Sequence, residues 1–227
     1  NMIIEVKNLT KTFTNGKIET PVLKGIDLRI APGEFVAIMG KSGAGKSTLM
    51  YQMSLLDEPT GGSVFVDGQD ILKLSNKEKT KFRLEKLGYV FQDYALLPEL
   101  SALENVMIPL IMRGFSDNTA KDKARKALAE VGLEHRIDNR PSQLSGGEQQ
   151  RVSIARAIAE DPKILFADEP TANLDSASGN HIVEVLRDIN KRGQTIVMVT
   201  HEKEYTLYCD RIIHLADGVV VREEKLK

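Results

Sequence analysis

The residues best suited to chemistry form a glycine-rich segment, Gly40-Lys41-Ser42-Gly43-Ala44-Gly45-Lys46-Ser47-Thr48. It satisfies the pattern G-x-x-x-x-G-K-[ST], in which glycines let backbone N–H groups turn inward around phosphate oxygens. The start of a following helix adds unpaired donors and partial positive charge. The segment therefore predicts a phosphate-binding loop, with Lys46 reaching the β- and γ-phosphates of a nucleotide and the Ser47 hydroxyl ligating Mg²⁺.

A second segment with unusual chemistry is Gln143-Leu144-Ser145-Gly146-Gly147-Glu148-Gln149-Gln150-Arg151. Ser145 and Glu148 have the spacing of a capping box, which starts a helix. A capped helix alone does not explain Gly146 and Gly147, since each costs a helix roughly 0.8–1.0 kcal/mol relative to alanine. The two glycines leave backbone N–H groups bare at the helix start, and we predict a second anion-binding site there.

Two adjacent carboxylates, Asp168 and Glu169, follow the apolar run Ile164 to Ala167. In open α/β sheets ligands bind at the carboxyl ends of the strands, and the alternative is a solvated acidic turn. We expect Asp168 to hold Mg²⁺, usually through water, and Glu169 to orient or deprotonate an attacking water. A further apolar run, residues 195–200, brings His201 to the same sheet edge.

The elements that position these groups are predicted from hydrophobic periodicity. Phe35 to Met39 is typical of a strand buried on both faces of a parallel sheet. Three segments predict an antiparallel layer beside it; two of them alternate with period two, and the last ends in the turn pair Asp67-Gly68. These segments are Ile3 to Val6, Ile26 to Ile30 and Val64 to Val66. Helices are expected at Lys77 to Lys86, Ala120 to Val131 and about residues 182–189, and a hairpin at Asp217-Gly218.

Three features leave alternatives open. Phe13 lies in the antiparallel layer, where its ring either stacks on an adenine base or packs at the core or sheet edge. Gln92 follows the predicted strand Leu87 to Phe91 and has a solvated amide as its plainer interpretation. The segment Asp93 to Leu100 mixes apolar and polar residues, which suits either a docking surface or burial within a helical lobe.

Composition limits the class of protein. The chain has 227 residues, 41% of them hydrophobic, and 31 Lys plus Arg against 32 Asp plus Glu give a formal net charge of −1. No bulk field attracts nucleic acid or an anionic membrane. The apolar run Val106 to Met112 is far shorter than the roughly 18–20 residues that span a bilayer. With no charged-then-apolar leader and one cysteine, Cys209, we expect a folded cytoplasmic chain without disulfides.

Taken together, these motifs resemble the ATP-binding-cassette (ABC) ATPases over nearly the whole chain. The resemblance rests on the ordered set of phosphate loop, Gln92, the signature Leu144 to Glu148, Asp168-Glu169, Asp175 and His201. Within that superfamily the chain is most similar to the transporter ATPases of the macrolide-export and lipoprotein-release group. Three segments carry the closer similarity, residues 96–106, 149–151 and 167–171.

The resemblance implies a fold and a set of cofactors. We expect an α/β phosphate-loop NTPase with a mixed central sheet, a flanking antiparallel β layer and a helical signature lobe at about residues 93–160 of a single 1–227 domain. ATP and Mg²⁺ are the expected cofactors, with Ser47, Gln92 and Asp168 around the ion. Phe13 stands where the family more often has tyrosine, and phenylalanine keeps the stacking face but lacks the hydroxyl. Lys41 and Ala44 also replace more common residues, at positions that are not critical for binding phosphate or metal.

The resemblance also implies a mechanism and partners. Two copies meet head to tail, so that the signature of one completes the ATP site on the other's phosphate loop, with Asp175 at the dimer contact. Lys46, Glu169, His201 and Gln92 are the implied catalytic set, with His201 near the γ-phosphate. Gln92 and the region Tyr94 to Arg113 would pass the motion to a membrane permease, which places the chain at the inner face of the membrane.

Two other classes of protein compete with this interpretation. A soluble ABC ATPase acting on nucleic acid or ribosomes usually carries a coiled-coil insertion or two cassettes in tandem, and neither is visible here. A phosphate-loop kinase has no reason for the signature segment. The transported cargo and the direction of transport do not follow from the sequence, because specificity in such systems resides in the membrane subunits.

Overall fold

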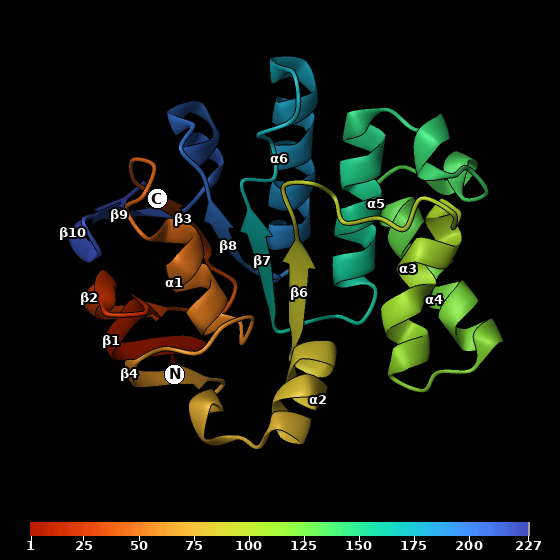
Figure 1. The fold of residues 1–227 in the computed structure, drawn as a ribbon. Helices are drawn as coiled ribbons and strands as arrows, with labels where there is room; N and C mark the ends of the chain where they lie inside the picture. Colours follow the sequence, from red (N-terminus) through yellow and green to blue (C-terminus); the bar gives the residue numbers. More distant parts are fainter. Residues whose placement is uncertain (227) are drawn as a thin grey trace.

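The computed structural model describes residues 1–226, which form two β-sheets with helices packed around them (Figure 1). The larger sheet has six strands in the order β10-β9-β3-β8-β7-β6. Strands β9, β3, β8, β7 and β6 run parallel, and β10 is antiparallel to β9, so the predicted mixed sheet is confirmed. Its strands are β3 (Phe35–Met39), β6 (Leu87–Val90), β7 (Ile164–Asp168), β8 (Thr195–Val199), β9 (Arg211–Ala216) and β10 (Val219–Lys225).

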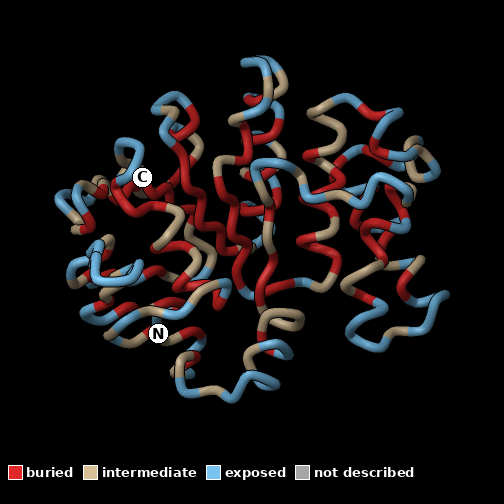
Figure 2. Tube along the Cα trace, in the orientation of Figure 1, coloured by how far each residue is buried: buried red, intermediate tan, exposed pale blue. Residues whose placement is uncertain are grey.

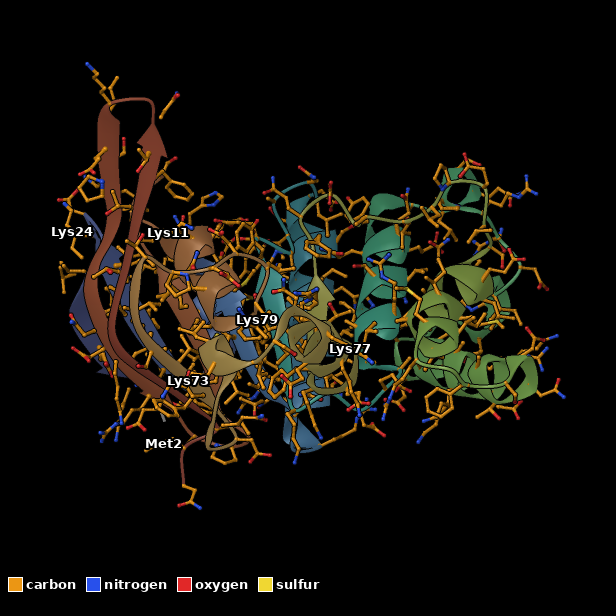
Figure 3. The ribbon with its side chains drawn as sticks, turned by 60° about the horizontal axis from the view of Figure 1, so that its bottom comes forward. Met2, Lys11, Lys24, Lys73, Lys77 and Lys79 are labelled. Atoms are coloured by element: carbon orange, nitrogen blue, oxygen red, sulfur yellow. The ribbon has the colours of Figure 1, made fainter. Side chains whose placement is uncertain are left out.

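The smaller sheet is antiparallel, in the order β2-β1-β4-β5. It contains β1 (Ile4–Asn15), β2 (Ile18–Ile30), β4 (Gly61–Val66) and β5 (Gln69–Asp70). The alternation Ile26, Leu28 and Ile30 is buried as predicted, while Asp27 and Arg29 are exposed. The first two strands are much longer than their apolar patterns, and their hairpin projects beyond the rest of the molecule (Figure 3).

The helices gather at two places. Helix α1 (Lys46–Met53) follows β3 directly, and α2 (Asn76–Lys86) lies at the start of β6. Three helices lie beyond β6, within the region predicted as the helical lobe, and α6 packs against α5 and β8. These are α3 (Ala102–Met112), α4 (Asp117–Glu130), α5 (Gly146–Ile158) and α6 (Ser176–Lys191). Short 3₁₀ turns cover Ile71–Lys73, Glu134–Arg136, Pro141–Gln143 and Lys203–Tyr208.

Buried residues follow the large sheet, whose strands β7 and β8 are buried along their whole length (Figure 2). One apolar cluster lies between this sheet and the helices α3 to α6, and the other lies between it and the antiparallel layer with α1. The carboxyl ends of β3, β7 and β8 therefore form a well-packed edge of the sheet, because these strands are buried on both faces. Cys209 is buried, and among residues 1–226 no helix is both long and apolar enough to cross a bilayer.

Some predicted boundaries were wrong in detail. The β6 strand ends at Val90 and not at Phe91, and in α6 Val183 is buried while Val185 is only partly so. The helix predicted at Ala120 begins earlier, at Asp117, because Ser116 caps it by accepting a hydrogen bond from the Thr119 N–H. Local capping chemistry set this start where apolar periodicity gave no signal.

Candidate nucleotide site

The phosphate loop depends on glycine at two positions for different reasons. A Cβ on Gly40 would lie 2.3 Å from the carbonyl oxygen of Leu215, because β9 passes directly beside the loop. Gly45 has φ +96° and forms the N-terminal boundary of α1, a left-handed conformation that favours glycine. No side chain caps α1, and no acidic residue lies in its first turn. The helix start therefore presents backbone donors without a competing negative charge.

Lys46 is buried within this loop. Its Nζ donates to the carbonyl oxygens of Gly40 at 2.8 Å and Lys41 at 3.1 Å. Only 8% of the residue is exposed. The ammonium group is thus fixed at the loop by two neutral acceptors, where an anion entering the loop would meet a positive charge whose solvation is already reduced.

Asp168 lies at the end of β7 with both carboxylate oxygens engaged. Ser47 Oγ donates to Oδ1 and the Tyr51 hydroxyl donates to Oδ2, each at 2.9 Å. Burial and the neighbouring Asp168 carboxylate raise the pKa of Tyr51 to about 12, so this hydroxyl stays protonated as a donor. The oxygen-only donor set of Ser47 and Asp168 fits Mg²⁺, which binds through one or two protein oxygens together with water and phosphate.

Glu169 and His201 meet at the same edge. His201 Nδ1 lies 2.9 Å from Glu169 Oε2, and the glutamate side chain is largely buried while the histidine is mostly exposed. Glu169 has φ +46°, and its N–H donates to the carbonyl oxygen of Val199 on β8. A left-handed backbone at a non-glycine residue costs energy of order 1–3 kcal/mol and is held by the surrounding sheet. The carboxylate of Glu169 lies against His201, whereas both oxygens of the neighbouring Asp168 contact α1.

Gln92 follows β6 as predicted, but its side chain is exposed and makes no hydrogen bond within residues 1–226. Its carbonyl oxygen accepts a hydrogen bond from Asn173 Nδ2 at 3.0 Å. The backbone at this position is therefore tied to the loop after Asp168 and Glu169. The structure does not join its amide to Ser47 or Asp168.

Two side chains of α5 to which the sequence analysis assigns no role, the buried Gln150 and the half-buried Arg156, hold the segment around Gln92. Gln150 Nε2 donates to the carbonyl oxygens of Phe91 at 3.2 Å and Pro170 at 2.6 Å. Arg156 donates to the carbonyl oxygens of Tyr94 and Ala95, two successive residues with positive φ. Burial lowers the pKa of Arg156. A signal existed for Gln150, since it is a polar residue four positions before Ile154 on the apolar face of its helix.

The signature segment caps α5 as predicted. Ser145 Oγ accepts from the Glu148 N–H at 3.2 Å, and Glu148 Oε2 accepts from the Ser145 N–H at 2.8 Å. This accepted backbone hydrogen bond holds the pKa of Glu148 below its usual range. The capping box engages the N–H groups of Ser145 and Glu148, and those of Gly146 and Gly147 lack a helical or capping partner at this end, as the sequence predicts.

The signature and the phosphate loop are separate within one chain. In Figure 1, α1 and α5 lie apart, with β8, β7 and α6 between them. Gly146 faces Tyr94 and Leu174, and Gly147 lies beside Ser178 at the start of α6. Asp175 is the N-cap of that helix, where it accepts hydrogen bonds from Ala177 and Ser178. These hydrogen bonds from Ser178 lower the pKa of Asp175.

Phe13 lies on the long β1–β2 hairpin and is 46% exposed. Lys11 Nζ lies 4.9 Å from the centre of its ring. Lys11 also pairs with Asp57, which fixes the cation on one side of the ring. Phe13 is therefore not part of the core, and its exposed position on the hairpin is compatible with packing at the sheet edge and with stacking on an adenine base.

The model of the "ABC transporter" family matches residues 23–172 of this chain. The matched range runs from the hairpin through the phosphate loop and the signature to Asp168 and Glu169. The chain belongs to the ABC transporter family. The predicted ABC ATPase is confirmed, and so are its α/β fold and its nucleotide, ATP.

Two relatives are similar in sequence over nearly the whole of this chain. The "Lipoprotein-releasing system ATP-binding protein LolD" of Geobacter metallireducens is 48% identical over 97% of this chain and 99% of its own length. The "Macrolide export ATP-binding/permease protein MacB" of Syntrophobacter fumaroxidans is 46% identical over 97% of this chain, which spans only 31% of that protein. This chain thus corresponds to the whole of the first relative and to about a third of the second.

A solved structure is similar in fold. The ATP-binding cassette MJ0796, described as a dimeric post-hydrolysis state bound to ADP and Pi, matches with a TM-score of 0.90 and 44% identity over 99% of both chains. A second dimeric structure of the same cassette matches equally well, with 45% identity. This similarity confirms the predicted phosphate-loop architecture.

Proposed function

We propose that two copies of this chain close head to tail around ATP, that hydrolysis reopens them, and that this cycle drives a separate membrane permease. The observation that carries the proposal is the distance in the fold between the two anion-binding helix starts, α1 and α5 (Figure 1). A single copy cannot use both on one phosphate chain. The dimeric description of the similar cassette MJ0796 supports a second copy as the missing half.

Each loop residue has a role on the nucleotide in this proposal. The backbone N–H groups of residues 40–48 surround the phosphates, and Lys46 moves from the carbonyl oxygens of Gly40 and Lys41 onto phosphate oxygens. The ring of Phe13 stacks on the adenine. Ser47 and Asp168 hold Mg²⁺, which neutralises charge on the phosphates when bound.

Glu169 is the group that activates water. Its carboxylate accepts the water's proton or orients the water toward the γ-phosphate, while His201 keeps the carboxylate in place through the 2.9 Å contact. His201 is exposed enough to reach the γ-phosphate as well. Gln92 approaches the site through the backbone tie to Asn173, which links its position to the loop that carries Glu169.

The signature of the second copy decides whether the halves stay together. A helix N-terminus alone contributes about 0.3–1 kcal/mol toward an anion, which is too little for a switch. Several hydrogen bonds to charged oxygens, each about 1.5–3 kcal/mol, make the γ-phosphate decisive. Ser145, Gly146 and Gly147 supply them. A two-fold arrangement makes the interface isologous, with two equal sites.

An apolar groove supports a permease as the partner. It lies between α2, β6, α3 and α5 and has a volume of about 350 Å³. Its lining includes Phe91, which precedes Gln92, and Arg156, which donates hydrogen bonds to the carbonyl oxygens of Tyr94 and Ala95 just after it. Met112 at its rim is 65% exposed. The segment Asp93 to Leu100 is partly buried and partly available for docking, since Leu96 packs on the core and Leu97 is exposed. A permease segment in this groove would sense movement of Gln92, with the cassette on the inner face of the membrane.

The proposal is tested with Glu169→Gln. Removing the water-activating carboxylate is expected to slow phosphate release by roughly 10² to 10⁴ and so to trap the ATP-bound dimer. Light scattering after gel filtration should give twice the monomer mass with ATP and the monomer mass with ADP. Only monomer in the presence of ATP would contradict the composite site.

The partner is tested by purifying the tagged chain from detergent-solubilised membranes. We expect an integral-membrane protein to co-purify, since the MacB relative is named as an ATP-binding and permease protein and the LolD relative as the ATP-binding protein of a lipoprotein-releasing system. Co-purification with nucleic acid or ribosomes instead would favour the competing soluble ATPase.

A further inference from the structure

Tyr51 contacts the candidate metal site although no motif includes it. Its hydroxyl donates to Asp168 Oδ2 at 2.9 Å, while Ser47 Oγ donates to Oδ1 at the same distance. Ser47 and Tyr51 are four residues apart on α1 and so share one face of that helix. One face of α1 therefore holds both carboxylate oxygens of Asp168, a residue at the end of strand β7.

The fold fixes the position of this hydroxyl. The Tyr51 ring is partly buried and packs on the apolar cluster that α1 shares with β3, β7 and β8. Helix α1 itself packs on β7 and β8, and β7 carries Asp168. Because the ring packs on the apolar cluster and the hydroxyl donates to Asp168, the Tyr51 side chain has little freedom to move away from Oδ2.

The alternative is that Tyr51 only stabilises the fold. A half-buried tyrosine commonly bonds to a backbone carbonyl, as Tyr89 does to the carbonyl oxygen of Ser54. Tyr51 instead bonds to the one carboxylate that, with Ser47, offers oxygen donors to Mg²⁺. A partner of a metal-holding group that orients it without touching the ion is the usual arrangement in metal sites, and its loss typically weakens metal binding by about 10–100-fold.

We propose that Tyr51 is a positioning residue that fixes the Asp168 carboxylate and thereby sets the preference of the nucleotide site for Mg²⁺ over Ca²⁺. Mg²⁺ demands near-ideal octahedral geometry, whereas Ca²⁺ accepts six to eight oxygens in irregular arrangements. A carboxylate held only by Ser47 can rotate, which penalises the ion with the stricter geometry. The inference rests on the proposed function, since it assumes a metal–nucleotide site at Asp168.

The test compares wild type with Tyr51→Phe, which keeps the ring and its packing and removes only the hydroxyl. Equilibrium binding of a non-hydrolysable ATP analogue is measured by calorimetry in EDTA, in excess Mg²⁺ and in excess Ca²⁺. We expect the Mg²⁺-supported affinity to fall about 10-fold. The Ca²⁺-supported affinity should fall far less, and the metal-free affinity should stay unchanged. The ratio of the two metal-supported affinities is the decisive quantity, because a general loss of stability would lower all three together.

Tyr89→Phe is the matched control. It removes a tyrosine hydroxyl bonded to a backbone carbonyl and should leave the Mg²⁺ to Ca²⁺ ratio at the wild-type value. An unchanged ratio in Tyr51→Phe, with wild type binding the Mg²⁺ complex, would overturn the inference alone. Absence of analogue binding by wild type under every condition would overturn the proposed function and the inference with it.

Discussion

The starts of α1 and α5 are the two anion-binding sites of the proposal, yet they differ in how they satisfy their own donors. Gly45 opens α1 with no side-chain cap and no acidic residue in the first turn. Ser145 opens α5 with a complete capping box, and Glu148 places a carboxylate in its first turn. The first helix start needs a ligand for its donors. The start of α5 is satisfied by its own cap, and only the N–H groups of Gly146 and Gly147 remain available to an anionic ligand.

This difference separates binding from switching. We propose that the α1 site, which is incomplete without phosphate, binds nucleotide in each copy independently, whereas the self-capped α5 site adds a modest, reversible increment to the stability of the dimer. The carboxylate of Glu148 opposes an approaching phosphate and so limits that increment. In the proposed cycle, loss of the γ-phosphate is then enough to release the second copy, while the first copy keeps hold of the remaining phosphates.

The largest effect is expected on the α1 side. Lys46→Ala removes an ammonium group that makes two hydrogen bonds in the loop, and at about 1.5–3 kcal/mol for each charged contact the ATP affinity should fall by roughly 10² or more. Nucleotide binding by calorimetry and phosphate release both measure it. Lys77→Ala, at an exposed lysine of α2, is the control. Unchanged affinity and turnover in Lys46→Ala would overturn the assignment of this loop.

A smaller and more selective effect is expected on the α5 side. The Cβ of Gly146→Ala would lie 3.0 Å from the Tyr94 hydroxyl and 3.2 Å from a Leu174 methyl group, so small side-chain shifts accommodate it. It crowds the N–H groups offered to the partner's phosphate, and loss of one charged hydrogen bond weakens the ATP-trapped dimer roughly 10-fold. Analytical ultracentrifugation of this variant in the Glu169→Gln background measures the change. Nucleotide affinity of the monomer should not change, and a dimer of full strength would refute the role of this glycine.

The smallest effect concerns pH. The pKa of Glu148 is lowered in the folded chain, so the unfolded chain takes up the proton first as pH falls. The resulting stability is complete above the ordinary glutamate pKa of about 4.3 and is lost as pH falls through the lowered folded value. Glu148→Gln should remove this acid-dependent part, as thermal unfolding between pH 3 and 7 would detect.

Glu104→Gln removes the same kind of cap from α3 and should change the pH dependence of unfolding in a similar way. It should not alter the ATP-driven dimer, whereas Glu148→Gln should strengthen it slightly by removing a negative charge beside Ser145. Equal dimer strength in both variants would show that the carboxylate of Glu148 acts only as a cap.

Much of the site could be predicted from the sequence because its parts are local. The run Phe35 to Met39, the glycines that follow it and the spacing of Ser145 and Glu148 encode a strand, a loop and a helix start within a few residues each. The carboxylates Asp168 and Glu169 were placed correctly because the end of a buried parallel strand is a fixed location in such sheets. Glycine and capping chemistry act over short distances, so neighbours along the chain suffice to specify them.

The contacts that tie the site together could not be predicted in this way. Tyr51 reaches Asp168 across 117 residues, and Arg156 reaches Tyr94 across 62. Both use polar groups whose partners are chosen by how α1 and α5 pack on the sheet. The length of the β1–β2 hairpin was missed for a related reason, since its outer half is held by strand pairing rather than by an apolar face.

By itself, the sequence determined the local chemistry of this protein: which residues are suited to bind phosphate, which carboxylates follow a buried strand and where two helices begin. Only the tertiary structure decided that both oxygens of Asp168 are held by one helix, that His201 lies against Glu169, and that the two anion-binding helix starts are apart. Chemistry of that first kind follows from residue type and local spacing. Distances between elements depend on packing free energy summed over many residues, which no local pattern carries.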